Sequence, residues 1–468
     1  MLDQNDNSRV EAAPLPRNKD GSIRKAFVKS IARSIETGDA AGLRAQLGGL
    51  HEADMGALLD VLSQEQRPRL VELLGIDFDF TALTEVDDAV REEILEELPP
   101  KTVAEGVREL ASDDAVTILS ALPKQEQAEI LDQLPPSERS ALARSLEYPE
   151  DSAGRRMQTD FIAVPSHWTV GQAIDYMRET ADLPERFYEL YVVDESGKFV
   201  GAVPLDRLLR SKRPVPLVEL MEAERRLVRA DEDKEEVARL FQRYDLVAAP
   251  VVDSVDRLVG VITFDDVADV IEEEAEEDIK ALGGVTRPEE LSDSVFSIAR
   301  GRFNWLLVNL GTAFIASSVL GLFEGQLQKM VALAVLAPIV ASQGGNATTQ
   351  TMTVAVRALA TQHLSEANAW RIIVRELLVG LVNGVAFAVI TGVGAYIWFK
   401  VPGLGVVIGL AMICNLVAAA LGGILVPLLL HRLKFDPAVA SSPFVTTVTD
   451  VVGFFSFLAI ATVWFGLR

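Results

Sequence analysis

The sequence predicts a multidomain fold in three parts: an α-helical solenoid at residues 23–147, a duplicated α/β unit at 155–272 and an all-α five-helix transmembrane domain at 301–468. Three observations predict it. Short amphipathic segments that end in Leu-Pro recur in the first part, a pattern repeats after 59 residues in the second, and five long apolar runs follow in the third. The chain is therefore a soluble body joined to a membrane body.

Net charge separates these two bodies. The chain has 44 Lys and Arg against 68 Asp and Glu, a net charge of −24. Residues 303–468 carry +3, so residues 1–302 carry −27. So acidic a soluble part is a poor partner for nucleic acid, because phosphate binding requires clustered Lys and Arg. The single cysteine, Cys414, lies in an apolar run, which excludes a disulfide-stapled secreted domain.

The chain begins with a polar segment, residues 1–22, that we expect to be a disordered tail. This segment has no apolar stretch of the kind that a signal peptide requires, so we expect the soluble part to stay in the cytoplasm. From residue 23 to 147, helices of about ten residues are closed by proline, as in 94–99, 118–123 and 130–135. Repeated short helices predict a superhelical domain that makes contacts rather than chemistry.

The middle part contains one unit twice. Two short motifs recur at a period of 59 residues: Val192-Val193-Asp194 as Val251-Val252-Asp253, and Val200-Gly201 as Val259-Gly260. Each copy predicts a helix (170–179 and 235–244), a β-branched strand, a turn, a second strand and a closing helix. This order resembles a tandem pair of CBS domains, a regulatory module that commonly binds adenine nucleotides.

The second copy ends in Thr263-Phe264-Asp265-Asp266. A CBS copy that binds a nucleotide often carries Thr/Ser-x-x-Asp at this place, so the resemblance implies ATP as a regulatory ligand near Thr263 and Asp266. The same pattern also caps the helix that follows, which leaves a purely structural interpretation open.

An acidic segment comes next. Nine carboxylates lie within fourteen residues that contain no Lys or Arg: Asp265, Asp266, Asp269, Glu272, Glu273, Glu274, Glu276, Glu277 and Asp278. On a helix such a density of like charge repels itself. A solvated acidic face is one interpretation. Because we expect residues 273–300 to form a connecting helix that leads to the first span, we favour a second interpretation, in which divalent cations clamp a regulator to a pore.

Five apolar runs are long enough to cross a bilayer, since a span needs about 20 apolar residues. They are residues 303–323, 330–356, 373–399, 404–430 and 439–466. With the soluble part inside the cell, most flanking Arg and Lys face the cytoplasm, as the positive-inside rule requires. We therefore expect a multi-pass protein of the cytoplasmic membrane, with its N-terminus in the cytoplasm and its C-terminus outside.

Two spans carry polar groups at membrane depth. The second contains Gly344-Gly345-Asn346, which suits either helix–helix contacts or a pore lining. The fifth contains Asp450, and a carboxylate at mid-span costs about 2.5–3.5 kcal/mol unless it meets water, a cation or a partner. Ser442 and Thr446 precede Asp450 by eight and four residues, so the three share one helical face. A stripe of oxygens of this kind suits a hard cation.

In this order, the solenoid, the CBS pair, the acidic helix and the five spans resemble the MgtE family of magnesium transporters and channels. The specific motifs are Gly344-Gly345-Asn346 through Arg357 in the second span, and Asp436-Pro437-Ala438 through Asp450-Val451-Val452-Gly453 in the fifth. The resemblance implies a homodimer with a pore on its two-fold axis. It implies that Asp450 is the acid of the ion site, that Thr446 and Ser442 line the pore, and that Asp436 lies at the cytoplasmic mouth.

The resemblance also implies a set of acids that bind inhibitory Mg²⁺: Asp233, Glu235, Asp245, Asp266, Asp269, Glu274, Glu277 and Asp278. In the helical domain, Asp113 matches one further acid of the family. Thr117 stands where the usual partner of that acid would lie, which leaves the part of the helical domain in Mg²⁺ sensing open.

The sequence thus predicts a Mg²⁺-selective uptake channel or transporter, not an enzyme, that cytoplasmic Mg²⁺ closes. No P-loop motif occurs, so uptake is expected to follow the membrane potential. A transporter of Co²⁺ or Mn²⁺, a divalent-cation exporter, and the choice between channel and carrier remain open. A membrane-anchored nucleotide sensor would explain the CBS pair but not Asp450, and an intramembrane protease would need a second deep aspartate.

Overall fold

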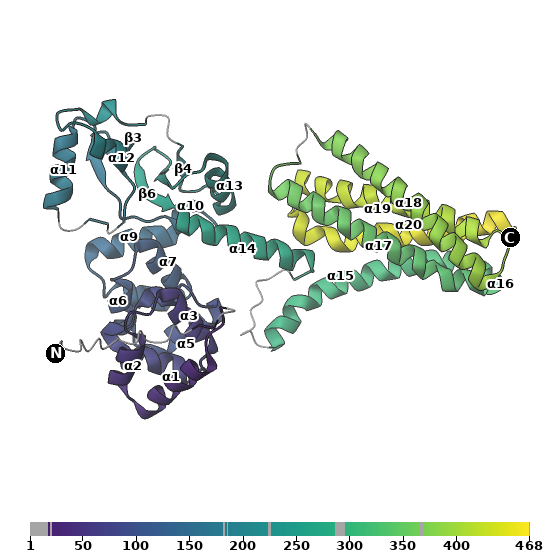
Figure 1. Cartoon of the computed structure of the whole chain (residues 1–468), viewed down its shortest axis with the longest axis horizontal. Coiled ribbons are helices and arrows are strands. Elements are labelled where there is room, and N and C mark those ends of the chain that lie inside the picture. The colour runs from purple at the N-terminus through teal and green to yellow at the C-terminus, as the bar shows by residue number, and fades with distance from the viewer. Residues whose placement is uncertain are drawn as a thin grey trace, which may run out of the picture. The chain divides into compact units, whose positions relative to one another are not determined.

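The computed structural model describes residues 17–18, 21–180, 183–184, 186–222, 226–285, 295–364 and 368–467, without the side chains of 439–442. The chain divides into two compact units, Met1–Glu272 and Glu273–Arg468. Each unit is described by itself below (Figure 1).

The first unit begins with a stack of short helices. They are α1 (Lys25–Thr37), α2 (Ala40–Leu47), α3 (Glu52–Val61), α4 (Gln66–Leu74), α5 (Asp88–Glu97), α6 (Pro100–Val107), α7 (Ser112–Ser120), α8 (Lys124–Leu131) and α9 (Pro136–Glu147). Prolines stand at the first positions of α6 and α9, where the missing N–H costs nothing. Ile31, Leu58 and Ile118 are fully buried in one continuous core. The predicted helical class of this part is confirmed.

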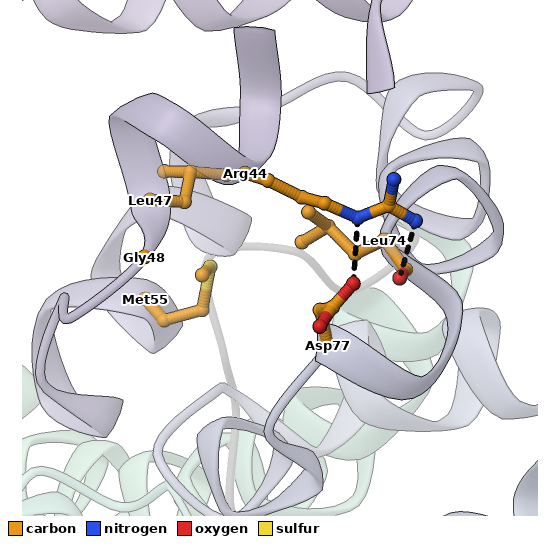
Figure 2. A pocket seen from close by; sticks show the side chains of 6 residues that line it. All are labelled: Arg44, Leu47, Gly48, Met55, Leu74 and Asp77. Carbon is orange, nitrogen blue, oxygen red and sulfur yellow. Dashed lines mark hydrogen bonds and ion pairs between the residues drawn. The ribbon is translucent and has the colours of Figure 1, made fainter. Parts of the chain in front are cut away.

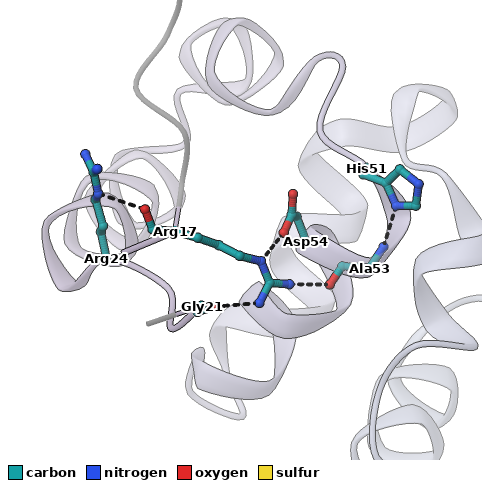
Figure 3. A network of polar contacts seen from close by, with 6 residues as sticks. All are labelled: Arg17, Gly21, Arg24, His51, Ala53 and Asp54. Carbon is teal, nitrogen blue, oxygen red and sulfur yellow. Dashed lines mark hydrogen bonds and ion pairs between the residues drawn. The ribbon is translucent and has the colours of Figure 1, made fainter. Parts of the chain in front are cut away.

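Part of the segment predicted to be disordered packs against α3 (Figure 3). The guanidinium of Arg17 donates to the carboxylate of Asp54, to Ala53 O at 3.3 Å and to Gly21 O at 2.8 Å. Residues 1–16, 19 and 20 of that predicted tail lie outside the described residues. The described end of the tail is therefore held by an ion pair to the helical domain.

Two three-stranded sheets follow, one for each copy of the repeat. The first copy has β1 (Ala163–Pro165), α11 (Val170–Glu179), β2 (Glu189–Val193), β3 (Phe199–Pro204) and α12 (Leu205–Arg210), and the second has β4 (Val228–Arg229), α13 (Lys234–Tyr244), β5 (Ala248–Val252), β6 (Leu258–Thr263) and α14 (Phe264–Leu282). The central strand pairs parallel to the first strand and antiparallel to the third in both sheets. The predicted α/β duplication is confirmed.

The register of the two sheets repeats as the sequence does. Val192 lies opposite Gly201 and Val251 opposite Gly260, and each sheet has an irregularity directly after that valine. The glycine of the second copy is required by packing, because a Cβ at Gly260 would stand 2.5 Å from the Met157 sulfur. The short helix α10 (Ala153–Arg156) leads into this region.

The helix α14 spans the boundary between the units, so residues 273–282 of the predicted connecting helix continue the last helix of the repeat. Gly284 then adopts φ 81°, a left-handed conformation that glycine tolerates and that ends the helix. Residues 286–294 lie outside the described residues, and α15 begins at Val295. The predicted connecting segment is therefore divided between two helices.

The second unit contains five helices that are long and apolar enough to cross a membrane: α15 (Val295–Leu322), α17 (Val331–Ala360), α18 (Ala369–Phe399), α19 (Leu404–Arg432) and the Pro443–Phe465 part of α20 (Pro437–Phe465). The short helix α16 (Glu324–Lys329) joins the first two. The five predicted spans are confirmed as helices of this kind. Helix α19 is the most buried and packs against α17, α18 and α20. Helix α15 buries only Ala316.

Candidate ion pathway and acidic clusters

Asp450, the predicted pore acid, lies near the middle of α20. Asp450 is half-buried, and in the described part of the chain no hydrogen bond or ion pair reaches its carboxylate. Thr446, one turn earlier, is exposed. Ser442 lies on α20, but its side chain is outside the described residues. A charged group inside a span without a partner within its own chain requires water, a cation or another chain.

The helix α17 also presents a polar face. Ser342, Asn346, Thr349 and Thr353 are exposed and spaced so that they lie along one side of the helix. The hydroxyls of Thr349 and Thr353 donate to carbonyls one turn earlier, at 3.0 and 2.9 Å. Lipid offers such a face nothing to bind, so it is suited to line a wet pathway or to meet another protein surface.

The two glycines of the predicted pore motif differ in their surroundings. A Cβ added at Gly344 would stand 2.1 Å from the side-chain nitrogen of Asn415, whereas nothing lies within 4 Å of one added at Gly345. Asn415 is a residue that the sequence analysis missed. Its signal was an amide in the middle of the apolar run that becomes α19.

At the other end of α20, acids gather at the predicted cytoplasmic mouth. Asp436 caps α20, since its Oδ1 accepts from Ala438 N at 2.8 Å. Burial raises the pKa of Asp278 near the end of α14, and the negative charges of Asp436 and Glu277 raise it further, while Arg357 lowers it. Positive charge is therefore favoured where Asp278 and Asp436 lie near each other.

The end of α14 is wedged between two spans of its unit. Ala281 is 1% exposed and lies in one hydrophobic cluster with Met352 and Val356 of α17 and Ala438 and Val445 of α20. The last turn of α14 thus contacts the same two helices that carry Asn346 and Asp450. A displacement of this turn would change the packing of both.

A second acidic cluster lies in the first unit, where the helical domain meets the repeat. Asp113 of α7 is 6% exposed, its Oδ2 accepts from Gln158 Nε2 at 3.1 Å, and its Oδ1 has no hydrogen-bond partner among the described residues. Burial, and then the neighbouring Asp113, raise the pKa of Asp266 well above its ordinary value. Two facing carboxyls of this kind retain a proton or attract a cation.

Asp114 and Glu85 extend this cluster, and the sequence analysis missed both. Burial raises the pKa of Asp114 to about 7, with further contributions from Asp113, Glu85, Asp265 and Asp269. Their signal was weak, since both belong to ordinary short acidic stretches of surface helices and turns. The structure thus brings Asp266 and Asp269 of the predicted regulatory set together with Asp113.

The remaining predicted regulatory acids are dispersed. Asp233 caps the start of α13, Glu235 is ion-paired with Arg239 at 2.6 Å, and Asp245 ends the same helix with φ 51°. Glu274 and Glu277 lie on the part of α14 that belongs to the second unit. Among the described residues, no group of three or more His, Cys, Asp or Glu is arranged as a ready-made metal centre.

The Thr263 and Asp266 pair makes an internal contact. Thr263 Oγ1 donates to Asp266 Oδ2 at 2.7 Å, and Thr263 N donates to the same oxygen at 3.3 Å. The pair therefore closes the start of α14, as the structural interpretation of this motif expects. A nucleotide ribose would have to compete for that carboxylate.

Two cavities lie away from these sites. One, of about 200 Å³, is lined by Arg44, Leu47, Gly48, Met55, Leu74 and Asp77 (Figure 2). Arg44 Nε donates to Asp77 Oδ2 at 2.6 Å across its rim. The other, of about 320 Å³, lies between α17, α18 and α19 and includes His363, Arg375 and Glu376. Asp450 lines neither of them.

The raised pKa of Asp114 predicts a pH dependence of stability. The folded state binds a proton up to about pH 7, whereas the unfolded chain releases it near the ordinary pKa of 3.8. The free energy of unfolding is therefore expected to fall as pH rises from 4 to 7 and to be lowest above pH 7. The total decrease is about 2 kcal/mol once the partial exposure of the Asp114 carboxyl is allowed for. Thermal unfolding of the full chain in chelator at pH 5.5 and 8 measures this. In Asp114→Asn the dependence should be weaker, and an unchanged dependence would exclude Asp114 as its source.

Comparisons with known families match three parts of the chain. Residues 50–151 match the MgtE intracellular N domain, residues 153–213 and 218–273 match the CBS domain, and residues 337–460 match MgtE, described as a divalent cation transporter.

Whole-length relatives are also found. The magnesium transporter MgtE of Thermus thermophilus is 36% identical over 452 residues, which cover 92% of this chain and 97% of that protein. The magnesium transporter MgtE of Bacillus subtilis is 29% identical over 430 residues, which cover 92% and 95%. A crystal structure of the cytosolic domain of the Mg²⁺ channel MgtE in complex with ATP is similar to 52% of this chain and 99% of its own, with 35% identity and a TM-score of 0.48.

Proposed function

The chain belongs to the MgtE family of divalent cation transporters, and from this premise we propose that it admits Mg²⁺ through a pathway lined by α17 and α20. The observation that carries the proposal is Asp450, a carboxylate halfway along a span with no partner among the described residues. The exposed polar face of α17 supports it. Members of this family are transporters or channels rather than enzymes.

The pathway is proposed to form between two copies of the chain. The polar face of α17 and Thr446 of α20 are exposed in a single chain, Asp450 is half-buried, and lipid cannot satisfy these polar groups. A two-fold axis along these faces would enclose them in water and bring one Asp450 from each subunit to the same level. Thr446 and Ser442 would continue the lining toward Asp436 at the cytoplasmic mouth. Asn346 and Gly345 of α17 would line the same pathway, whereas Gly344 of the predicted motif is buried and faces Asn415 of α19 instead.

Mg²⁺ is the proposed cargo because it retains its water shell tightly and binds oxygen ligands. A wide pathway with one carboxylate per subunit can select such an ion in its hydrated state. The inside-negative potential favours entry of a divalent ion by about 4.6 kcal/mol per 100 mV. The protein would lie in the cytoplasmic membrane, with its N-terminus in the cytoplasm and its C-terminus outside.

Cytoplasmic Mg²⁺ is proposed to close the pathway. At high concentration Mg²⁺ would neutralise two groups of acids: the cluster of Asp113, Asp266 and Asp269, and the pair of Asp278 and Asp436. Mg²⁺ would thereby favour the state in which the end of α14 holds α17 and α20 together. The other acids proposed to take part are Asp233, Glu235, Asp245, Glu274 and Glu277. Closure is then a population shift that depends on the different affinities of two states for the ion.

Ion flux in vesicles of the purified full chain tests the function. Mg²⁺ is expected to enter down an inside-negative potential, and Co²⁺ and Mn²⁺ to enter more slowly at equal concentration. Faster flux of Co²⁺ or Mn²⁺ would assign the chain to another cation. Flux that requires an outward gradient of a second ion would indicate a carrier or an exporter. No flux of any divalent cation would exclude transport.

Two roles of Asp436 can be separated by mutation. Asp436→Asn keeps a side chain that caps α20 but removes the charge at the mouth, so the protein should fold normally and carry Mg²⁺ several-fold more slowly at low ion concentration. Asp436→Ala also removes the cap, which costs about 1 kcal/mol. Flux and thermal unfolding are measured in parallel. Equal flux in Asp436→Asn and wild type would remove Asp436 from the pathway.

An adenine nucleotide is proposed as a second regulatory ligand, on the Thr263-x-x-Asp266 pattern of the second repeat. Because Asp266 also faces Asp113, ATP and Mg²⁺ would act on the same carboxylate. Calorimetric titration of ATP into the full chain, with Asp266→Asn as the comparison, tests this. Binding of equal strength in both would place the nucleotide elsewhere.

A further inference from the structure

The amide of Asn415 lies where three membrane helices meet. It is fully buried on α19, and its Nδ2 donates to Val340 O of α17 at 2.7 Å. A Cβ at Gly344 of α17 would stand 2.1 Å from that nitrogen, and a Cβ at Gly453 of α20 would stand 2.8 Å from it. The Asn415 side chain therefore fits only because both of its neighbours are glycines.

Both glycines are close along the chain to residues of the proposed pathway. Gly344 precedes Asn346 by two residues on α17, and Gly453 follows Asp450 by about one turn on α20. Asn415 belongs to α19, which contributes no residue to that pathway. It thus contacts, from outside, the two helices that are proposed to form the pathway.

Stability alone does not explain an amide at this position. Interhelical hydrogen bonds contribute little in membrane proteins. The Oδ1 of Asn415 is buried and has no hydrogen-bond partner among the described residues. The free-energy cost of burying this oxygen unpaired is at least as large as the gain from the hydrogen bond of Nδ2. A leucine would occupy a similar volume without that cost. What a leucine cannot do is bind one particular carbonyl of α17 and so fix the position of that helix along its axis.

We infer that Asn415 is a positioning residue, which sets the register and separation of α17 and α20 and so the distance between Asn346 and Asp450. This inference rests on the proposed function. Since a hydrated cation is selected by the width and charge of its pathway, a change in this distance should alter which divalent cation passes fastest.

The first experiment replaces the amide without a large change in volume. Asn415→Leu is expected to unfold at a temperature close to that of wild type. Its Mg²⁺ flux should fall about tenfold and its ratio of Mg²⁺ to Mn²⁺ flux should change, because small displacements in a preorganised site have large effects. Wild-type flux and an unchanged ratio would overturn the inference. A parallel loss of flux and thermal stability would also overturn it, because the residue would then be merely structural.

The second experiment tests the contact by exchanging volume. Gly344→Ala requires the Asn415 side chain to leave its hydrogen bond, so folded yield and flux should both fall. The double variant Gly344→Ala/Asn415→Ala makes room for the new methyl group and should recover the folded yield. Gly394→Ala on α18 is the matched control, because nothing lies within 4 Å of a Cβ there. If the folded yield of the double variant were no higher than that of Gly344→Ala, the inferred contact between Gly344 and Asn415 would be wrong.

Asp450→Asn, measured in the same vesicles, separates the two proposals. If Asp450→Asn carries Mg²⁺ at the wild-type rate, the proposed pathway is wrong and the inference falls with it. If Asp450→Asn is inactive while Asn415→Leu keeps wild-type flux and selectivity, only the role of Asn415 is wrong.

Discussion

Replacing Asp450 by Asn is expected to lower Mg²⁺ flux about 100-fold while leaving the protein folded. Two unit charges 4 Å apart attract by about 4 kcal/mol at an effective dielectric constant of 20, and a hydrated divalent ion lies further away but carries twice the charge. A loss of even two thirds of that stabilisation corresponds to about 100-fold in rate. Uptake of Mg²⁺ into vesicles, with thermal unfolding of the same samples, measures both effects.

Two variants make this result specific. Asp450→Glu keeps the charge and should retain part of the flux. Glu324→Gln removes an acid from the exposed helix α16, outside the spans, and should carry Mg²⁺ as wild type does. If Asp450→Asn transported Mg²⁺ normally, the pathway along α20 would be wrong. Loss of transport in Glu324→Gln as well would point to a general effect of charge rather than to a site.

The second large effect is expected at the regulatory acids. In the triple variant Asp266→Asn, Asp269→Asn and Glu274→Gln, the pathway should stay open at internal Mg²⁺ concentrations that close the wild type. A ligand shifts an equilibrium only by its different affinity for the two states, and these substitutions remove the carboxylates that would provide it. The concentration of internal Mg²⁺ that halves the flux should rise about tenfold or more.

The structure adds a sharper variant to this test. Asp113→Asn removes the charge that faces Asp266 and leaves the acids of α14 in place, so it should weaken inhibition although Asp113 lies in the helical domain. The control for the triple variant, matched in charge, neutralises Glu92, Glu96 and Glu97, which are exposed on α5. Normal inhibition in Asp113→Asn would exclude the helical domain from Mg²⁺ sensing. Loss of inhibition in the control would show that net charge, rather than a site, closes the pathway.

Much of the fold was predictable because its signals are local. The repeated Val-Val-Asp and Val-Gly motifs predict the two sheets, and the helix predicted at 170–179 has those bounds in the structure. The five apolar runs predict five helices because the length of a span is imposed by the bilayer. Segment boundaries were harder, since α14 continues across the predicted end of the repeat at residue 272.

The sites were only partly predictable. The place of Asp450 near the middle of a span was predictable because a carboxylate in an apolar run is conspicuous in any sequence, while its role in ion transport stays a prediction. Two other features depend on which distant segments pack together: the proximity of Asp113 to Asp266 and the contact of Asn415 with Gly344. The amino-acid sequence alone contains no direct signal for either pairing. Burial changes the chemistry further, because Asp114 looks like any surface acid until desolvation raises its pKa to about 7.

The continuous helix α14 has a mechanical consequence. Its 19 residues, Phe264–Leu282, include Asp266 in the first turn and Ala281 in the last, which packs between α17 and α20. Such a helix is a stiff rod about 28 Å long, so a tilt of about 5° at one end moves the other by about 2 Å. A small tilt of α14 would therefore displace its last turn, which contacts α17 and α20. If Mg²⁺ closes the pathway as proposed, the bending stiffness of α14, as well as the affinity of the acids, would set how much cation closure requires.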